Sequence, residues 1–143
     1  MNVFSGMSKR LGVVAYRAAS SEEHVAAMIS CFHTISIPAE YIELIREASE
    51  IELFIDGHDY FRIWGANGVL EMNLAYRIQD YLPGALAIGD DGGGSTLFYA
   101  SAAYGVGLFR TGLGDLDMSD AVYIASSLTA LLKGGEGLEK LTL

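Results

Sequence analysis

The sequence predicts an α+β fold in one domain, with a largely antiparallel sheet, or a mixed sheet as the alternative, flanked by N-terminal helices, one inserted helix and a C-terminal helix. Apolar residues recur at helical spacing before residue 48, which predicts helices there. Short runs rich in β-branched and aromatic residues then dominate between residues 51 and 109, which is typical of strands. Helices followed by a run of strands favour α+β over an alternating α/β arrangement.

One domain is expected over residues 20–143, behind an N-terminal extension. With 143 residues, of which 51% are hydrophobic, the chain is long enough to bury a core without disulfides. Residues 1–19 carry a weak pattern with a short apolar run at 11–16. We expect this extension either to add an edge strand or to fray, because chain ends are ordered only when contacts tie them down.

Two helices are expected before the first strands. Ser20 and Glu23 have the spacing of a capping box, so the first helix begins there and ends near His33. Cys31 lies beside its apolar face, where a buried and inert cysteine is expected. The second helix begins near Pro38, because proline costs nothing in the first helical turn.

A hairpin is expected next. Residues 51–55 and 60–64 have strand composition, and Asp56-Gly57 between them is a strong short-turn signal. A helix over residues 69–78 interrupts the strands. The remaining elements are expected as strands at 85–88, 96–99 and 104–109 and a closing helix over 122–132.

A loop of two carboxylates and four glycines connects the middle pair of strands. Its residues are Gly89, Asp90, Asp91, Gly92, Gly93 and Gly94. We interpret the loop as a structural turn in which at least one of the last three glycines has positive φ and the aspartates make local hydrogen bonds. A hard cation is the alternative ligand for such carboxylates, but the residue spacing of a calcium loop is absent. No metal or cofactor is therefore expected.

The chain is acidic, with a formal net charge of −9 and a pI near 4.6. Such a surface repels nucleic acid and anionic membranes, so neither is expected as a direct partner, whereas a basic protein is. Cys31 is the single cysteine, which excludes an intrachain disulfide and favours a reducing compartment. The N-terminus lacks the long apolar region of a signal peptide, and a cytoplasmic location is expected.

No catalytic group can be assembled from these residues, and we expect the chain not to be an enzyme. His58 and Asp59 are a potential acid–base pair, and Cys31 with His33 is a potential nucleophile and base. Both pairs lack a third group that would orient the base.

Three segments resemble the Smi1/Knr4-like domains of the SUKH superfamily. Residues Ile37–Ile45, IPAEYIELI (motif 1), look like that family's LPxxYxxFL helix. Residues Leu86–Gly94, LAIGDDGGG (motif 2), are similar to its central strand and glycine-rich turn. Residues Ser126–Leu132, SSLTALL (motif 3), look like its closing SFxxFL helix. The chain departs from the pattern at Ala48–Glu50, where the family has an Asn-Gly-Gly turn, and at Leu128, where it has an aromatic residue.

This resemblance implies a function in protein binding without catalysis. Bacterial members of the superfamily are regarded as immunity proteins that neutralise secreted polymorphic toxins, often nucleases, and a fungal branch acts in cell-wall signalling. An immunity protein that binds a basic toxin domain is therefore expected. An intracellular scaffold or regulatory module without a toxin partner is the alternative.

Two groups of residues are candidates for contact with such a partner. The first is a run of glutamates along the second helix and its exit, and the second is a pair of aromatic residues from the following strand. They are Glu40, Glu43, Glu47 and Glu50, with Tyr60 and Trp64. The alternatives are a solvated helix face for the glutamates and a core position for Trp64.

Overall fold

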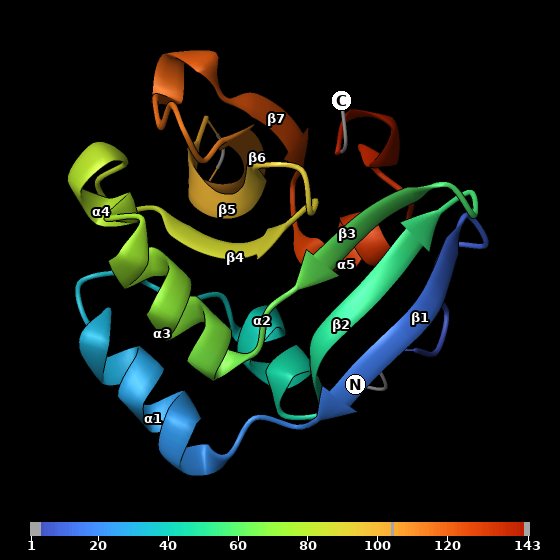
Figure 1. The fold of residues 1–143 in the computed structure, drawn as a ribbon, viewed down its shortest axis with the longest axis horizontal. Coiled ribbons are helices and arrows are strands. Elements are labelled where there is room, and N and C mark those ends of the chain that lie inside the picture. Colours follow the sequence, from blue (N-terminus) through green and yellow to red (C-terminus); the bar gives the residue numbers. More distant parts are fainter. Residues whose placement is uncertain (1–3, 104, 142–143) are drawn as a thin grey trace.

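The computed structural model describes residues 4–103 and 105–141, in which seven antiparallel strands form one sheet in sequence order, β1 to β7 (Figure 1). The strands are β1 (Leu11–Ala18), β2 (Ala48–Ile55), β3 (Asp59–Ile63), β4 (Leu86–Asp90), β5 (Ser95–Ala102), β6 (Gly105–Gly112) and β7 (Val122–Ala125). The predicted α+β class is confirmed, and the sheet is antiparallel rather than mixed. Residues 1–3, to which the expectation of fraying also applied, lie outside the described residues.

The helices of the described residues connect these strands. They are α1 (Glu22–Cys31), α2 (Ala39–Ile45), α3 (Ala66–Ala75), α4 (Ile78–Tyr81) and α5 (Leu128–Leu132), with short 3₁₀ helices at Met118–Asp120 and Leu138–Lys140. In Figure 1, α1 and α3 lie side by side below β4. Within the described ranges, every helix is too short or too polar to cross a bilayer.

The N-terminal extension joins the same sheet as the rest of the chain. β1 pairs with β2 and forms one edge of the sheet, and most of its side chains are exposed. The first helix begins one residue later than predicted, because Ser21 caps it by accepting a hydrogen bond from the backbone N–H of His24 at 3.1 Å. Ser20 instead accepts one from the N–H of Ala66 at 3.0 Å. The expectation of a buried Cys31 was wrong, because that side chain is exposed.

The Asp56-Gly57 hairpin is confirmed. The carbonyl oxygen of Ile55 accepts a hydrogen bond from the N–H of His58 at 3.0 Å, and the two residues between them have φ of 54° and 70°. Both values are positive, as a type I′ turn requires. Arg10 then binds the Asp56 carboxylate with two hydrogen bonds of 3.1 and 2.9 Å, which ties the turn to the chain before β1.

The ladder between β3 and β4 is the shortest in the sheet. It consists of Arg62 with Asp90 and Ile63 with Gly89, so the sheet bends here into a β1–β3 part and a β4–β7 part (Figure 1). Gly89 permits this approach, because a Cβ at that position would lie 2.3 Å from the carbonyl oxygen of Arg62. The predicted positive φ in the adjoining turn is confirmed at Gly92 (75°) and at Gly94 (102°).

The inserted helix is interrupted at Arg77. That residue has a φ of 55°, so the predicted helix over 69–78 is split into α3 and α4. Asn73 of α3 is fully buried, and its amide bonds both backbone groups of Ala87 in β4, at 2.8 and 3.0 Å. It also donates to the carbonyl oxygen of Val69 at 2.8 Å and accepts from Gln79 at 2.9 Å. The helix is thereby fixed to the sheet.

The expected closing helix over residues 122–132 was wrong in its first half. Val122–Ala125 form β7, which pairs with β6 through Phe109 and Tyr123, and the two rings pack edge to face with centroids 5.5 Å apart. β-branched and aromatic side chains favour a strand here although the spacing of the apolar residues also fits a helix. The helix begins only after Ser127, whose side chain accepts a hydrogen bond from the N–H of Ala130 at 2.9 Å.

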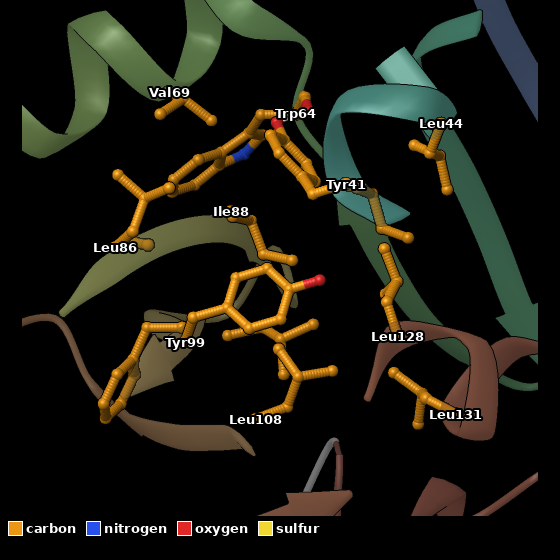
Figure 2. Close-up of a cluster of buried hydrophobic side chains, with 14 of the residues drawn as sticks. Tyr41, Leu44, Trp64, Val69, Leu86, Ile88, Tyr99, Leu108, Leu128 and Leu131 are labelled. Carbon is orange, nitrogen blue, oxygen red and sulfur yellow. Dashed lines mark hydrogen bonds between the residues drawn. The ribbon is translucent and has the colours of Figure 1, made fainter. Parts of the chain in front are cut away.

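The hydrophobic core lies where the helices meet the bent sheet. Figure 2 shows side chains from α2, α3, β4, β5, β6 and α5 converging on one cluster. Tyr41 and Tyr99 pack edge to face within it, with ring centroids 6.4 Å apart. The hydroxyl of Tyr41 donates to the carbonyl oxygen of Trp64. The backbone N–H of Trp64 in turn donates to the carbonyl oxygen of Ile88 at 2.8 Å. Helix α2 is thus joined to β4 through the end of β3.

Candidate functional site: a polar cleft on the open sheet face

Polar residues form a continuous row across one face of the sheet. This face is opposite to the one that carries the side chains of Ile51, Leu53 and Ile55. Cross-strand pairing places each polar residue directly beside the next, from β2 to β6. The row (the polar row) consists of Glu52, Arg62, Asp90, Thr96 and Thr111. Its two threonines are buried, whereas its first two members are half-buried and reach solvent.

Asp90 holds the middle of the polar row together. Its Oδ2 accepts hydrogen bonds from the Trp64 indole N–H at 2.6 Å and from Arg62 Nη2 at 3.0 Å, and its Oδ1 accepts from the N–H of Gly92 at 2.8 Å. Asp91 Oδ1 accepts from two further backbone N–H groups of the loop, at 2.8 and 3.0 Å. Both aspartates therefore make the local hydrogen bonds that were expected of a structural turn. The expected turn is shorter than predicted, because Gly89 and Asp90 belong to β4 and Oδ2 of Asp90 bonds residues of another strand and its exit.

A cleft of about 400 Å³ opens beside the exposed end of the polar row. It lies between the edge strand β1, the neighbouring strands β2 and β3, and the first two turns of α3. Its walls carry three carboxylates and two guanidinium groups. The lining residues are Ala15, Tyr16, Arg17, Glu50, Glu52, Arg62, Asn67, Gly68 and Glu71. We call this the β1–α3 cleft.

Glu50 shapes the inner wall of the β1–α3 cleft. Its φ is 47°, and its Oε1 accepts a hydrogen bond from the N–H of Gly65 at 3.2 Å. A Cβ at Gly68 would lie 2.7 Å from that oxygen and 2.9 Å from the Cβ of Trp64, so glycine is required for this packing. The carboxylate faces Arg62, with 4.0 Å between Glu50 Oε2 and Arg62 Nε.

Arg62 and Tyr60 supply the polar groups on the β3 side. Burial lowers the pKa of Arg62, but its hydrogen bond and ion pair with Asp90 outweigh this, so that its pKa is raised and the guanidinium stays charged. Burial, followed by a hydrogen bond to Glu52, raises the pKa of Tyr60 to about 12. Tyr60 therefore donates to Glu52 Oε1, at 2.7 Å, while its ring packs edge to face against Phe54.

The four candidate glutamates do not share one surface. Glu40 bridges α2 to α5: its carboxylate accepts from the N–H groups of Leu128 and Thr129, at 2.7 and 3.0 Å, and from the Tyr99 hydroxyl at 2.7 Å. This arrangement caps the N-terminus of α5, where a negative charge is favourable. Burial and then the charge of Glu40 raise the pKa of Tyr99.

The other candidates have different surroundings. Glu43 and Glu47 are exposed, whereas Glu50 lines the β1–α3 cleft. Trp64 is only 2% exposed, and its indole N–H donates to Asp90. It is therefore a core residue, which was the alternative expectation, and not a contact residue. Glu50 and Tyr60 are therefore the two predicted contact residues that lie on or next to the cleft.

The catalytic pairings considered from the sequence lie on the surface. His58 Nδ1 is 3.0 Å from Asp59 Oδ1, and the His58 side chain is 87% exposed. Within residues 4–103 and 105–141, no group of three histidine, cysteine, aspartate or glutamate residues is placed to hold a metal ion.

The sequence patterns did not indicate that Glu52, Arg62 and Glu71 belong to one site. A signal was present for the first two, because the Asp56-Gly57 turn fixes the hairpin register and sets Glu52 opposite Arg62. Glu71 comes from α3, and only the packing of that helix against the sheet brings it to the cleft.

No family model matches the chain, and no curated protein matches its sequence.

Proposed function

We propose that this chain is a non-catalytic protein-binding domain that acts as an immunity protein against a secreted toxin. On this proposal it is a Smi1/Knr4-like domain, works in the cytoplasm, and holds a basic toxin domain in an inactive complex. It contacts neither nucleic acid nor membrane directly, because its charge repels both.

The observation that carries the proposal is the mutual contact of the three motifs. Glu40 of motif 1 accepts a hydrogen bond from the N–H of Leu128 in motif 3. Tyr41 of motif 1 donates to the carbonyl oxygen of Trp64, which is bonded through its own N–H to Ile88 of motif 2. Segments that resemble one family in sequence order are thus joined in one core. This arrangement supports a shared fold for the whole chain.

The charge of the chain supports a basic partner. Acidic residues outnumber basic ones by 18 to 9, and exposed carboxylates occur on α1, on α2 and around the β1–α3 cleft. Complementary charge accelerates the encounter with an oppositely charged protein and disfavours partners of like charge. Nuclease toxins must bind nucleic acid and are commonly basic, which makes them the fitting class of partner.

A scaffold or regulatory module without a toxin partner is the second candidate. It uses the same binding surface, and the same contact of the motifs supports it. The two candidates differ in what the partner does, since only a toxin is neutralised by the interaction.

Co-expression with the products of neighbouring genes separates the two candidates. If a neighbour encodes a secreted toxin, its toxin domain should co-purify with this chain, and co-expression should restore the growth of cells that the toxin domain otherwise kills. Co-purification with a non-toxic protein, without any such rescue, would instead favour the scaffold.

A further inference from the structure

We infer that the β1–α3 cleft is the contact point for a single arginine side chain of the basic partner. This inference rests on the proposed function for its partner, but it concerns a site of this chain that can be tested without that partner. The cleft is open to solvent and has a volume of about 400 Å³. A concave site of this kind fits a side chain that protrudes from the partner better than it fits a flat partner surface.

The charges of the cleft favour a cation. Three carboxylates line it, from Glu50, Glu52 and Glu71, against two guanidinium groups. Arg62 donates to Asp90 through Nη2, and Asp90 lies outside the lining. The Nε of Arg62 is buried 4.0 Å from Glu50 Oε2 and has no hydrogen-bond partner among the described residues. The carboxylates of Glu52 and Glu71 then outnumber the remaining guanidinium, that of Arg17, so the cleft is net negative.

Two of these carboxylates retain capacity for a new hydrogen bond. In the described part of the chain, Glu52 uses one oxygen to accept from Tyr60, and Glu71 accepts one long bond of 3.5 Å from Asn67. The second oxygen of each accepts no hydrogen bond from residues 4–103 or 105–141. Glu50, by contrast, is held by the N–H of Gly65 and by its approach to Arg62.

The positions of these carboxylates fit a guanidinium better than an ammonium. Glu52 belongs to a strand and Glu71 to a helix, so they lie on different walls of the cleft. A guanidinium presents five donors in a fixed plane and can bond groups on two sides at once, whereas an ammonium is a compact point charge.

Arg17 limits the affinity of the cleft for a cation. It lies on the edge strand β1, is exposed, and makes no ion pair with any described residue. Its positive charge at the rim opposes an incoming arginine. Removal of this charge should therefore strengthen binding, and no purely structural role of the cleft leads to that expectation.

The inference is tested with N-acetyl-arginine amide as the probe, and with N-acetyl-citrulline amide as a neutral control of the same shape. Titration followed by amide NMR shifts should give saturable changes at Glu52, Gly68 and Glu71 with the arginine probe alone. Glu52→Gln with Glu71→Gln should weaken binding about fivefold, because two half-exposed ion pairs are lost. Both substitutions keep an acceptor for Tyr60 and Asn67. Glu23→Gln on α1 should change nothing, and Arg17→Gln should tighten binding about twofold.

Equal shifts with the citrulline probe, no saturable shifts at the cleft, or equal binding by the double variant would each overturn the inference. Its failure is distinguishable from that of the proposed function. A toxin complex that forms equally well with Glu52→Gln and Glu71→Gln would contradict the arginine site alone. Arginine binding without any toxin partner would leave the site standing and contradict the function.

Discussion

Asn73 makes four hydrogen bonds from one buried amide, the full capacity of its two donor hydrogens and its acceptor oxygen. Asn73→Ala removes all four, including the bonds to both backbone groups of buried Ala87. We expect a loss of about 3 kcal/mol in the free energy of unfolding, measured by urea denaturation. Asn67→Ala, an exposed change in the same helix, should alter it by less than about 0.5 kcal/mol. Similar losses for the two variants would contradict the role given to Asn73.

The Asp56 carboxylate provides a test by pH. Its hydrogen bonds from Arg10 lower the pKa of Asp56 below its usual value of 3.8. A pKa depressed in the folded state gives stability that is present above the unfolded pKa and is lost as the pH falls through the folded pKa. NMR titration should therefore find the Asp56 midpoint below 3.8 in the wild-type chain. In Arg10→Gln the midpoint should rise towards that value, and an unchanged midpoint would count against the ion pair.

At the scale of elements, the junction of β3 and β4 depends on the absence of one Cβ. Gly89→Ala places a methyl group against the carbonyl oxygen of Arg62 and should separate the two strands. We expect a destabilisation of about 2 kcal/mol by thermal or urea unfolding. Gly12→Ala is the matched control, since a Cβ there meets no heavy atom within 4 Å, and it should be neutral or stabilise by about 0.5 kcal/mol. A neutral Gly89→Ala would show that the contact between the two strands does not depend on the missing Cβ.

Most elements were predictable because local signals and tertiary packing agree. The Asp56-Gly57 turn, the glycines after Asp91 and the first two helices all follow from short-range rules. β7 was not predictable in this way, because Val122 and Tyr123 fit a helical pattern as well as a strand. Pairing with β6 decides between them. The break between α3 and α4 at Arg77 was likewise not predictable, because no glycine or proline occurs there.

The candidate site was predictable only in part. Charge and aromatic character mark Glu50 and Tyr60 in the sequence, and both lie on or next to the β1–α3 cleft. Glu40 has the same charge as Glu50, yet it caps α5 by bonding Leu128, which is 88 residues away in the sequence. The sequence does not distinguish a carboxylate that bonds a distant backbone N–H from one that faces solvent, because no local pattern indicates the distant partner.

At the scale of the whole molecule, the excess of acidic groups should govern the rate of encounter with a basic partner. Salt screens such attraction, with a Debye length of about 8 Å at physiological ionic strength. We expect the association rate with the toxin domain to fall at least tenfold between low and high salt, while dissociation changes less. Glu43→Lys, on the exposed side of α2, should slow association further without lowering the melting temperature. An association rate that changes neither with salt concentration nor with Glu43→Lys would contradict the electrostatic part of the proposal.

We propose that this chain acts by binding and not by catalysis. A titration of toxin activity distinguishes these two modes of action. A fixed amount of the toxin domain from a neighbouring gene is mixed with increasing amounts of the chain, and residual toxin activity is measured after short and long incubation. A binding inhibitor abolishes activity in fixed proportion to the amount added, and the endpoint does not move with time. An endpoint that moves to ever smaller amounts as incubation lengthens would mean that each chain inactivates many toxin molecules, and would contradict the account.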